Sequence, residues 1–304
     1  MSDTSKGIIL MILAALLLPA ADSLSKLLAE TYSPLQVVWS RNLFQMILFL
    51  PWALSLLRGR RLLPRRPLIH LLRAACFVGG SLAYVAALKR IPLVEAQTLV
   101  FVFPLLVIVL SILFLGERVQ RSTWIAGALG LTGTVIVLGP GGAIDPPGAA
   151  FALLAASTTA IYMLLNRLLA DGGRAFLLII PPTFGAIALG ITMPAIWIAP
   201  TGLDWGLFLL TGAVFALAHA LIIVAFTLVE ANRLAPLTYF QMISGVTLGY
   251  LLFGDWPDPT IWLGLAAIVG AGVLIQLNSQ RNNAQNTLAR AQNPVKPVRH
   301  GQSD

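Results

Sequence analysis

Three ionisable residues lie within long apolar runs near the start of the chain, where they could do chemistry. Asp22 and Lys26 are four positions apart, so they share one face of a helix. If this run and the next form a helical hairpin that turns near Tyr32, Asp22 lies ten positions before the turn and Arg41 nine after it. The two side chains then lie at similar depth. We therefore expect Asp22, Lys26 and Arg41 to form a cluster.

Charged groups surrounded by lipid are costly, and by default they face protein or a water-filled interior. The cluster could bind a charged or zwitterionic substrate, or Asp22 could carry a coupling proton. Alternatively, the three groups only neutralise one another and fix the hairpin, since buried ion pairs are poor sources of stability. The sequence leaves both interpretations open.

The same hairpin argument applies to His219 and Gln241, which each lie eleven positions from Glu230. His219 could bind substrate or titrate near neutral pH, or it could hydrogen-bond a neighbouring helix. Trp39 and Tyr84 could line the same cavity, because aromatic faces suit a ring-bearing or cationic substrate. The alternative, which is the commoner role of such a residue, is helix packing. Further candidates for this cavity are Asn42, Gln97, Thr98, Tyr162 and Tyr239.

The composition indicates whether these residues lie in a soluble protein or in a membrane protein. Of 304 residues, 58% are hydrophobic and 11% are charged, which is too apolar for a soluble domain. The net charge of +8 does not indicate a nucleic-acid partner, because Lys and Arg lie in short connections and the tail. Cys76 is the single cysteine, so no intrachain disulfide and no metal site are expected. HExxH, GxSxG and P-loop motifs are absent from the sequence, and we expect neither an enzyme nor a cofactor.

A membrane span takes about 20 mostly apolar residues. Ten ranges meet this criterion: 7–29, 34–57, 67–89, 92–115, 122–139, 148–170, 175–199, 204–228, 232–253 and 259–277. Residues 278–304 are polar and are predicted to form a disordered cytoplasmic tail. The second and third spans are joined by a segment that contains Arg58, Arg60, Arg61, Arg65 and Arg66. The positive-inside bias then predicts that both termini are cytoplasmic.

The chain also repeats itself. A shift of 138 positions lays residues 86–138 over 224–276 and pairs Gly116 and Glu117 with Gly254 and Asp255. Because each half holds five spans, an odd number, the second copy crosses the membrane in the opposite sense. We predict an all-α integral membrane protein with ten transmembrane helices in two inverted five-helix repeats, residues 7–139 and 148–277. In transporters, such repeats enclose a central cavity that opens to each side in turn.

The first copy contains Pro92, Glu95-Ala96, Pro104, Leu115-Gly116-Glu117-Arg118, Trp124, Gly127, Gly130 and Gly133. This pattern resembles the signature of EamA domains in the drug/metabolite transporter superfamily. The second copy, with Gly254, Asp255, Trp262 and Gly264, is a weaker example. The resemblance implies two inverted repeats that move small metabolites across an inner membrane by alternating access. We interpret Pro92, Pro104, Gly116, Glu117, Gly254 and Asp255 as architectural.

The opening pattern of Asp22, Lys26, Tyr32, Pro34, Gln36 and Arg41 is similar to a bacterial subgroup that includes carriers assigned to S-adenosylmethionine uptake and to riboflavin. The resemblance implies uptake of such compounds. Export of amino acids or other metabolites is the alternative, and a non-transporting membrane scaffold or receptor is an alternative from a different class. The expected partners are a small-molecule substrate and the lipid bilayer, with protons or an exchanged metabolite as candidates for coupling. The oligomeric state is left open.

Two further patterns concern the helices themselves. Gly245 and Gly249 form a GxxxG motif, which predicts close helix packing either inside the molecule or at a dimer face. Pro104 lies within the fourth span, and Pro181, Pro182 and Pro194 lie within the seventh. These prolines predict kinks or breaks in the two helices.

Overall fold

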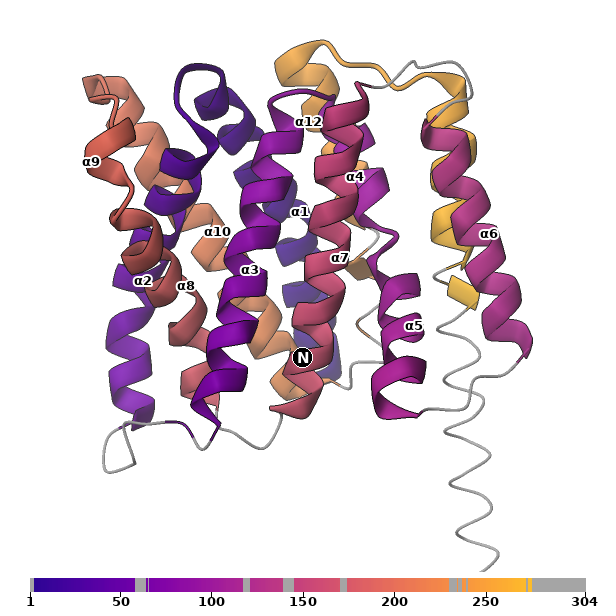
Figure 1. The fold of residues 1–304 in the computed structure, drawn as a ribbon, viewed down its shortest axis with the longest axis horizontal. Helices are drawn as coiled ribbons and strands as arrows, with labels where there is room; N and C mark the ends of the chain where they lie inside the picture. Colours follow the sequence, from indigo (N-terminus) through magenta and orange to yellow (C-terminus); the bar gives the residue numbers. More distant parts are fainter. Residues whose placement is uncertain are drawn as a thin grey trace, which may run out of the picture.

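A computed structural model of the chain describes residues 3–57, 64, 66–116, 121–138, 145–169, 174–229, 234, 237–238, 240–271 and 273–274. Within these residues the fold is a bundle of helices without strands (Figure 1). Each of the ten ranges predicted as spans contains at least one helix. The predicted tail, residues 278–304, and the architectural candidate Glu117 lie outside the described residues.

The labelled helices are α1 (Asp3–Thr31), α2 (Pro34–Leu57), α3 (Pro67–Leu88), α4 (Leu93–Val100), α5 (Phe103–Leu115), α6 (Arg121–Leu138), α7 (Pro146–Leu168), α8 (Arg174–Gly190), α9 (Met193–Ile196), α10 (Gly202–Leu228) and α12 (Phe240–Phe253). A last helix spans Pro259–Ala271. Six apolar segments of the described chain are long enough to cross a membrane: Asp3–Thr31, Pro34–Ser55, Pro67–Leu88, Leu93–Phe114, Pro146–Asn166 and Gly202–Phe226. The apolar helices Gly127–Ile136, Phe176–Gly190, Phe240–Phe253 and Pro259–Ala271 are shorter.

Local sequence accounts for several helix ends. The Asp145 carboxylate accepts a hydrogen bond of 2.9 Å from the Gly148 N–H at the start of α7, and α10 begins with a capping box of Thr201 and Asp204. At the other ends, Gly116 follows α5 with a φ of 64°, and Gly254 follows α12 with a φ of 71°. A left-handed backbone conformation favours glycine, so the backbone geometry explains why glycine occurs at both positions.

Two of the predicted spans are interrupted. The fourth divides into α4 and α5 around Phe101 and Val102. Pro104, near the start of α5, has no N–H to donate to the carbonyl of Val100. The seventh was predicted as one helix over 175–199, which is too long, because α8 ends at Gly190 and Pro194 lies in the first turn of the short helix α9. Proline is favoured in a first turn, where its missing N–H leaves no bond unmade.

The helices pack in a regular set of pairs. The most extensive packing joins α1 to α10, α3 to α7 and α2 to α8, followed by α2 with α10, α1 with α12 and α3 with α8. At one edge of the bundle, α6 lies along the helix Pro259–Ala271 (Figure 1). A Cβ atom on Gly133 would lie 2.7 Å from the Gly264 carbonyl oxygen, so the absence of a side chain permits this contact.

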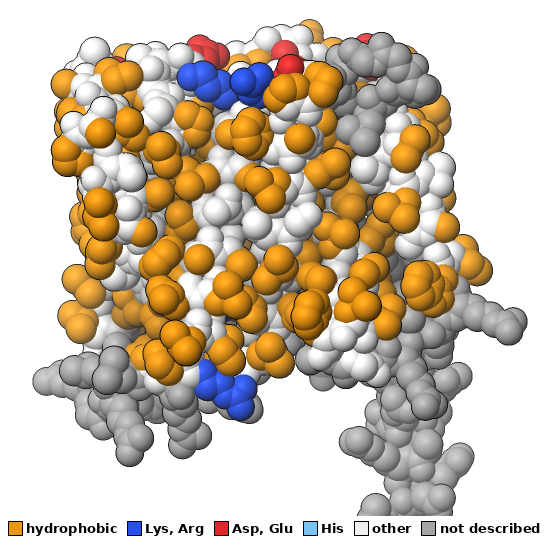
Figure 2. Space-filling model, in the orientation of Figure 1, with side chains coloured by type: hydrophobic (Ala, Val, Ile, Leu, Met, Phe, Trp, Pro, Cys, Tyr) orange, Lys and Arg blue, Asp and Glu red, His pale blue; other side chains and the backbone are white. Residues whose placement is uncertain are grey.

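The surface shows which solvent the bundle faces. A broad band of hydrophobic side chains covers the middle of the face in Figure 2, and charged side chains gather at its two ends. Many large apolar side chains on the outside of the bundle are exposed, and Leu68 and Leu203 are each 78% exposed. In water such a surface would aggregate, whereas a bilayer interior matches it. The fold is that of a multi-pass integral membrane protein.

Candidate functional site

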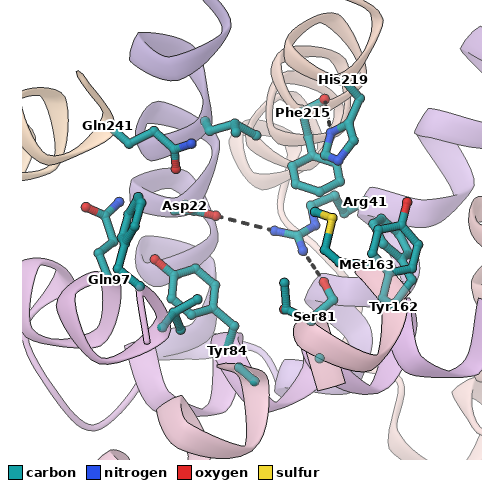
Figure 3. Close-up of a pocket in the computed structure, with 17 residues that line it drawn as sticks. Asp22, Arg41, Ser81, Tyr84, Gln97, Tyr162, Met163, Phe215, His219 and Gln241 are labelled. Carbon is teal, nitrogen blue, oxygen red and sulfur yellow. Dashed lines mark hydrogen bonds and ion pairs between the residues drawn. The ribbon is translucent and has the colours of Figure 1, made fainter. Parts of the chain in front are cut away.

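A cavity of about 230 Å³ lies between the helices and is lined by several polar side chains of the bundle interior. We call it the central chamber (Figure 3). Its polar and aromatic lining consists of Asp22, Arg41, Phe77, Ser81, Tyr84, Gln97, Phe101, Thr159, Tyr162, Phe215, His219 and Gln241. These residues come from α1, α2, α3, α4, α7, α10 and α12, with Phe101 at the break between α4 and α5. Both halves of the chain therefore contribute to one chamber.

Asp22 and Arg41 meet inside the chamber, as the hairpin argument predicted. Arg41 Nη1 lies 3.7 Å from Asp22 Oδ1, and Arg41 Nη2 donates a hydrogen bond to Ser81 Oγ. The guanidinium carbon also lies 3.9 Å from the ring centroid of Phe215, within the range of a cation–π interaction. Arg41 is 3% exposed, so the chamber holds a buried cation beside a carboxylate.

Several other polar atoms of the chamber have no direct hydrogen bond. They are Arg41 Nε and Nη1, Tyr84 Oη, and both Oε1 and Nε2 of Gln97. The Tyr84 and Gln97 side chains lie close to the Asp22 carboxylate without completing a bond of good geometry. Buried donors and acceptors left unpaired cost free energy. A polar ligand in the chamber would satisfy them.

His219 stands on the opposite side of the chamber from Gln241 (Figure 3). Its Nδ1 lies 3.0 Å from the carbonyl oxygen of Phe215 on the same helix. Because a carbonyl only accepts, Nδ1 carries the proton in this contact. The ring centroid of His219 lies 4.2 Å from that of Phe215 and 6.0 Å from that of Phe77. The observed partner is thus one turn back on α10 and does not lie on a neighbouring helix.

Lys26 does not join the predicted cluster, and this corrects the three-residue grouping. Its Nζ lies 2.9 Å from Asp255 Oδ2, beyond the end of α12, and 4.5 Å from the ring centroid of Phe253. Lys26 lies one turn beyond Asp22 on α1, and its long side chain can carry the ammonium group away from its own helix. Asp255, interpreted from sequence as architectural, is therefore the ion-pair partner of Lys26.

Trp39 likewise lies outside the central chamber. Its indole N–H donates a 3.0 Å hydrogen bond to the Ala186 carbonyl on α8, and its ring centroid lies 5.7 Å from that of Trp197. Two other candidates bond to their own helices, Asn42 to the Val38 carbonyl and Thr98 to the Val94 carbonyl. Tyr239 lies outside the described residues.

Five residues of the polar and aromatic lining were not predicted from the sequence: Phe77, Ser81, Phe101, Thr159 and Phe215. Helical spacing from predicted candidates could have found them. Phe77, Ser81 and Tyr84 recur at intervals of four and three along α3, which places them on one face of the helix. In the same way, Phe215 lies four positions before the candidate His219 on α10, so the two share a helix face.

A multi-pass helical bundle with a polar chamber between its helices is typical of membrane transport proteins. Comparison with known proteins agrees. The profile of the EamA-like transporter family matches residues 5–139. The riboflavin transporter of Rhizobium johnstonii is 32% identical over 221 residues, which cover 71% of this chain and 72% of that protein. The chain belongs to the EamA-like transporter family and is a membrane transporter.

Other relatives carry different names. The S-adenosylmethionine uptake transporter of Rickettsia bellii is 26% identical over 84% of this chain and 88% of its own length. The pseudopaline exporter of Pseudomonas aeruginosa is 26% identical over 88% of this chain and 93% of its own. A solved crystal structure aligns with a TM-score of 0.63 and 22% identity over 92% of this chain and 98% of its own. That last likeness concerns the fold alone.

Proposed function

We propose that this chain is a secondary transporter that takes up a small zwitterionic, ring-bearing metabolite by alternating access. S-adenosylmethionine is the first candidate substrate and riboflavin the second. The observation that carries the proposal is the buried Asp22–Arg41 pair of the central chamber, surrounded by unpaired polar atoms and aromatic rings. The proposed location is the inner membrane, with both termini cytoplasmic, as the arginine-rich segment between α2 and α3 favours.

The proposal includes ten crossings in two inverted repeats, residues 7–139 and 148–277. The helix pairs support this arrangement. The repeats relate α1 to α7, α2 to α8, α3 to α10, α4 and α5 to α12, and α6 to Pro259–Ala271. If each helix is replaced by its counterpart in the other repeat, the packing pair α1–α10 becomes α7–α3, and the pair α2–α10 becomes α8–α3. All four of these packing pairs occur in the structure. The pairs α2–α8 and α6 with Pro259–Ala271 map onto themselves. A pseudo-twofold axis produces this pattern.

The substrate class follows from the chemistry of the central chamber. Arg41 can bind a carboxylate, and Asp22 can bind an ammonium or sulfonium group, while Phe77, Tyr162 and Phe215 offer faces to a ring. S-adenosylmethionine carries all of these groups. Riboflavin supplies the ring and hydrogen-bonding groups but no charge for Arg41. The chamber therefore favours the zwitterion, and the names of the relatives supply both candidates.

Two alternatives give different results in a flux experiment. An exporter, as the pseudopaline relative is named, would move substrate out of the cytoplasm. A scaffold or receptor would bind a ligand and move nothing. We expect cells that produce the protein to accumulate labelled S-adenosylmethionine from the medium, which an exporter would not do. Protein reconstituted in liposomes should exchange the labelled for the unlabelled compound, which a scaffold or receptor would not do.

Arg41→Gln should reduce S-adenosylmethionine flux at least about tenfold, because a charge-assisted contact is worth about 1.5–3 kcal/mol. Arg66→Gln is the matched control, since Arg66 is an exposed arginine next to α3. Riboflavin flux, where present, should depend less on Arg41. If neither compound crosses the liposome membrane, whether or not the liposomes are first loaded with unlabelled compound, the proposed substrates are contradicted. Equal flux in the wild type and Arg41→Gln would remove Arg41 from the site.

A further inference from the structure

A second cavity of about 430 Å³ adjoins the central chamber, and we call it the lower chamber. Four residues line both cavities: Phe77, Tyr162, Met163 and His219. The rest of the lower chamber comes from α2, α3, α7, α8 and α10, nearer the end of the bundle where α3 begins. A ligand leaving the central chamber toward that end would pass these four shared side chains.

Arg73 lines the lower chamber and is 1% exposed. It lies eight positions before Ser81, the hydrogen-bonding partner of Arg41, on the same helix. At 1.5 Å per residue, the two positions are about 12 Å apart along α3. Arg41 and Arg73 therefore provide one buried guanidinium for each chamber.

Arg73 donates its hydrogen bonds to uncharged acceptors, and these bonds have a structural explanation. Nη2 lies 3.2 Å from the carbonyl oxygens of both Phe176 and Leu177. Pro181, four positions after Leu177 on α8, has no N–H, so the Leu177 carbonyl lacks its helical donor. Arg73 supplies a donor in its place. Nη1 donates to Asn166 Oδ1 at 3.0 Å.

These contacts leave Arg73 without an anionic partner, and its one aromatic contact among the described residues is the Tyr162 ring, whose centroid lies 5.6 Å from the guanidinium carbon. Every acceptor bonded to it is neutral, and no carboxylate of the described residues lies within 4.0 Å of it. Arg73 Nε has no hydrogen-bonding partner, and neither has Gln45 Oε1 in the same chamber. A buried cation inside a membrane is expensive unless an anion neutralises it.

We propose that Arg73 forms a second, separate binding subsite for the carboxylate of a small organic anion in the lower chamber. This subsite rests on the proposed transport function, in which the substrate carboxylate passes from Arg41 to Arg73 as it leaves the central chamber. The aromatic rings of Phe77 and Tyr162 face the ligand from the wall between the two cavities. A phosphate would meet the same chemistry, so a lipid headgroup is the competing source of the anion.

The test uses benzoate as the probe, because it combines a carboxylate with a ring and does not depend on which substrate is transported. The full chain carries Arg41→Gln, so that the central chamber no longer offers its guanidinium. We expect benzoate still to raise the midpoint of thermal unfolding, as a ligand of the folded state does. Adding Arg73→Gln should raise the half-saturating benzoate concentration at least about tenfold, whereas adding Arg66→Gln should leave it unchanged.

Arg73→Lys separates charge from the structural role of Arg73. Lysine keeps the charge, so benzoate binding should weaken less than in Arg73→Gln. Equal benzoate binding with and without Arg73→Gln, or equal loss in Arg73→Lys and Arg73→Gln, would overturn the subsite. Loss of benzoate binding in phosphatidylglycerol nanodiscs but not in phosphatidylcholine nanodiscs would overturn it in favour of a site for the headgroup of an anionic lipid. If S-adenosylmethionine is not transported but benzoate binding still depends on Arg73, the proposed substrate is contradicted and the proposed subsite is not.

Discussion

Arg41 meets Asp22 at 3.7 Å, which is close enough for charge attraction but too long for a direct hydrogen bond. Its guanidinium is shared among a carboxylate, a hydroxyl and an aromatic face. Two of its nitrogens, Nε and the Nη1 that faces Asp22, make no hydrogen bond. A pair that served only to fix the α1–α2 hairpin would gain most from a closed, fully bonded geometry. The open geometry leaves donors for a ligand.

The role of this pair can be separated from its contribution to stability by a double-mutant cycle. Asp22→Asn should lower the thermal unfolding midpoint, because removing one partner of a buried pair costs about 3–5 kcal/mol. Adding Arg41→Gln removes the stranded charge and should recover part of that loss. Uptake should stay as low in the double variant as in Arg41→Gln alone. If uptake returned together with stability, Asp22 and Arg41 would only neutralise each other.

Counting positions from a turn predicted the Asp22–Arg41 pair, because the depth of a residue in a helical hairpin depends only on chain geometry. It could not predict the partner of Lys26, since Asp255 is 229 positions away and reaches it only after the second half has packed on α1. Arg73 was missed for a different reason. It lies inside a predicted span, which was signal enough to consider it, but its acceptors belong to α7 and α8 and depend on tertiary packing.

Among the helices, α12 shows how close helix packing affects the position of a side chain in the central chamber. Its GxxxG motif faces α4: a Cβ on Gly245 would lie 1.9 Å from Gln97 Oε1, and one on Gly249 would lie 3.5 Å from Val94 Cγ2. The two alternatives for this motif were internal packing and a dimer face, and the contacts are internal. Gln97 also lines the central chamber, so the closeness of α12 determines where its amide can lie.

Gly245→Ala should therefore affect binding more than stability. The new methyl group displaces the end of a flexible side chain, which costs less than moving backbone, and the displaced amide leaves the chamber. We expect a several-fold rise in the KM for S-adenosylmethionine uptake, with an unfolding midpoint near that of the wild type. Gly249→Ala is the matched control, because 3.5 Å is an ordinary contact. Adding Gln97→Ala to Gly245→Ala should cause little further change, and a fully additive effect would contradict this connection.

On the scale of the whole molecule, polar contacts join the two halves of the chain at both ends. Those of Arg73 lie toward the end where α3 begins, and a second set lies at the end where α1 stops. Lys26 pairs with Asp255, Tyr32 Oη donates a 2.6 Å hydrogen bond to Asp204 on α10, and the Gln36 amide bonds to the Ile198 backbone. Together they tie α1 and α2 to the second half of the chain. The lower chamber lies toward the opposite end. The structure thus resembles a transporter closed at the end that holds Lys26, and the proposed alternating access requires these contacts to break.

Breaking the Lys26–Asp255 pair should open that end more often. The assay uses Cys76→Ser with a new cysteine at Ser81 in the central chamber, labelled by a membrane-impermeant maleimide from either side. Asp255→Asn should raise the labelling rate from the side of Asp255 about two- to fivefold, because a partly exposed ion pair contributes roughly 0.2–1 kcal/mol to the closed state. Asp145→Asn is the control, since Asp145 pairs with Arg90 at 3.4 Å without joining α1 to the turn after α12. Equal labelling in the two variants would mean that Lys26 and Asp255 do not hold this end closed. A rise from the opposite side alone would reverse the assignment of the closed end.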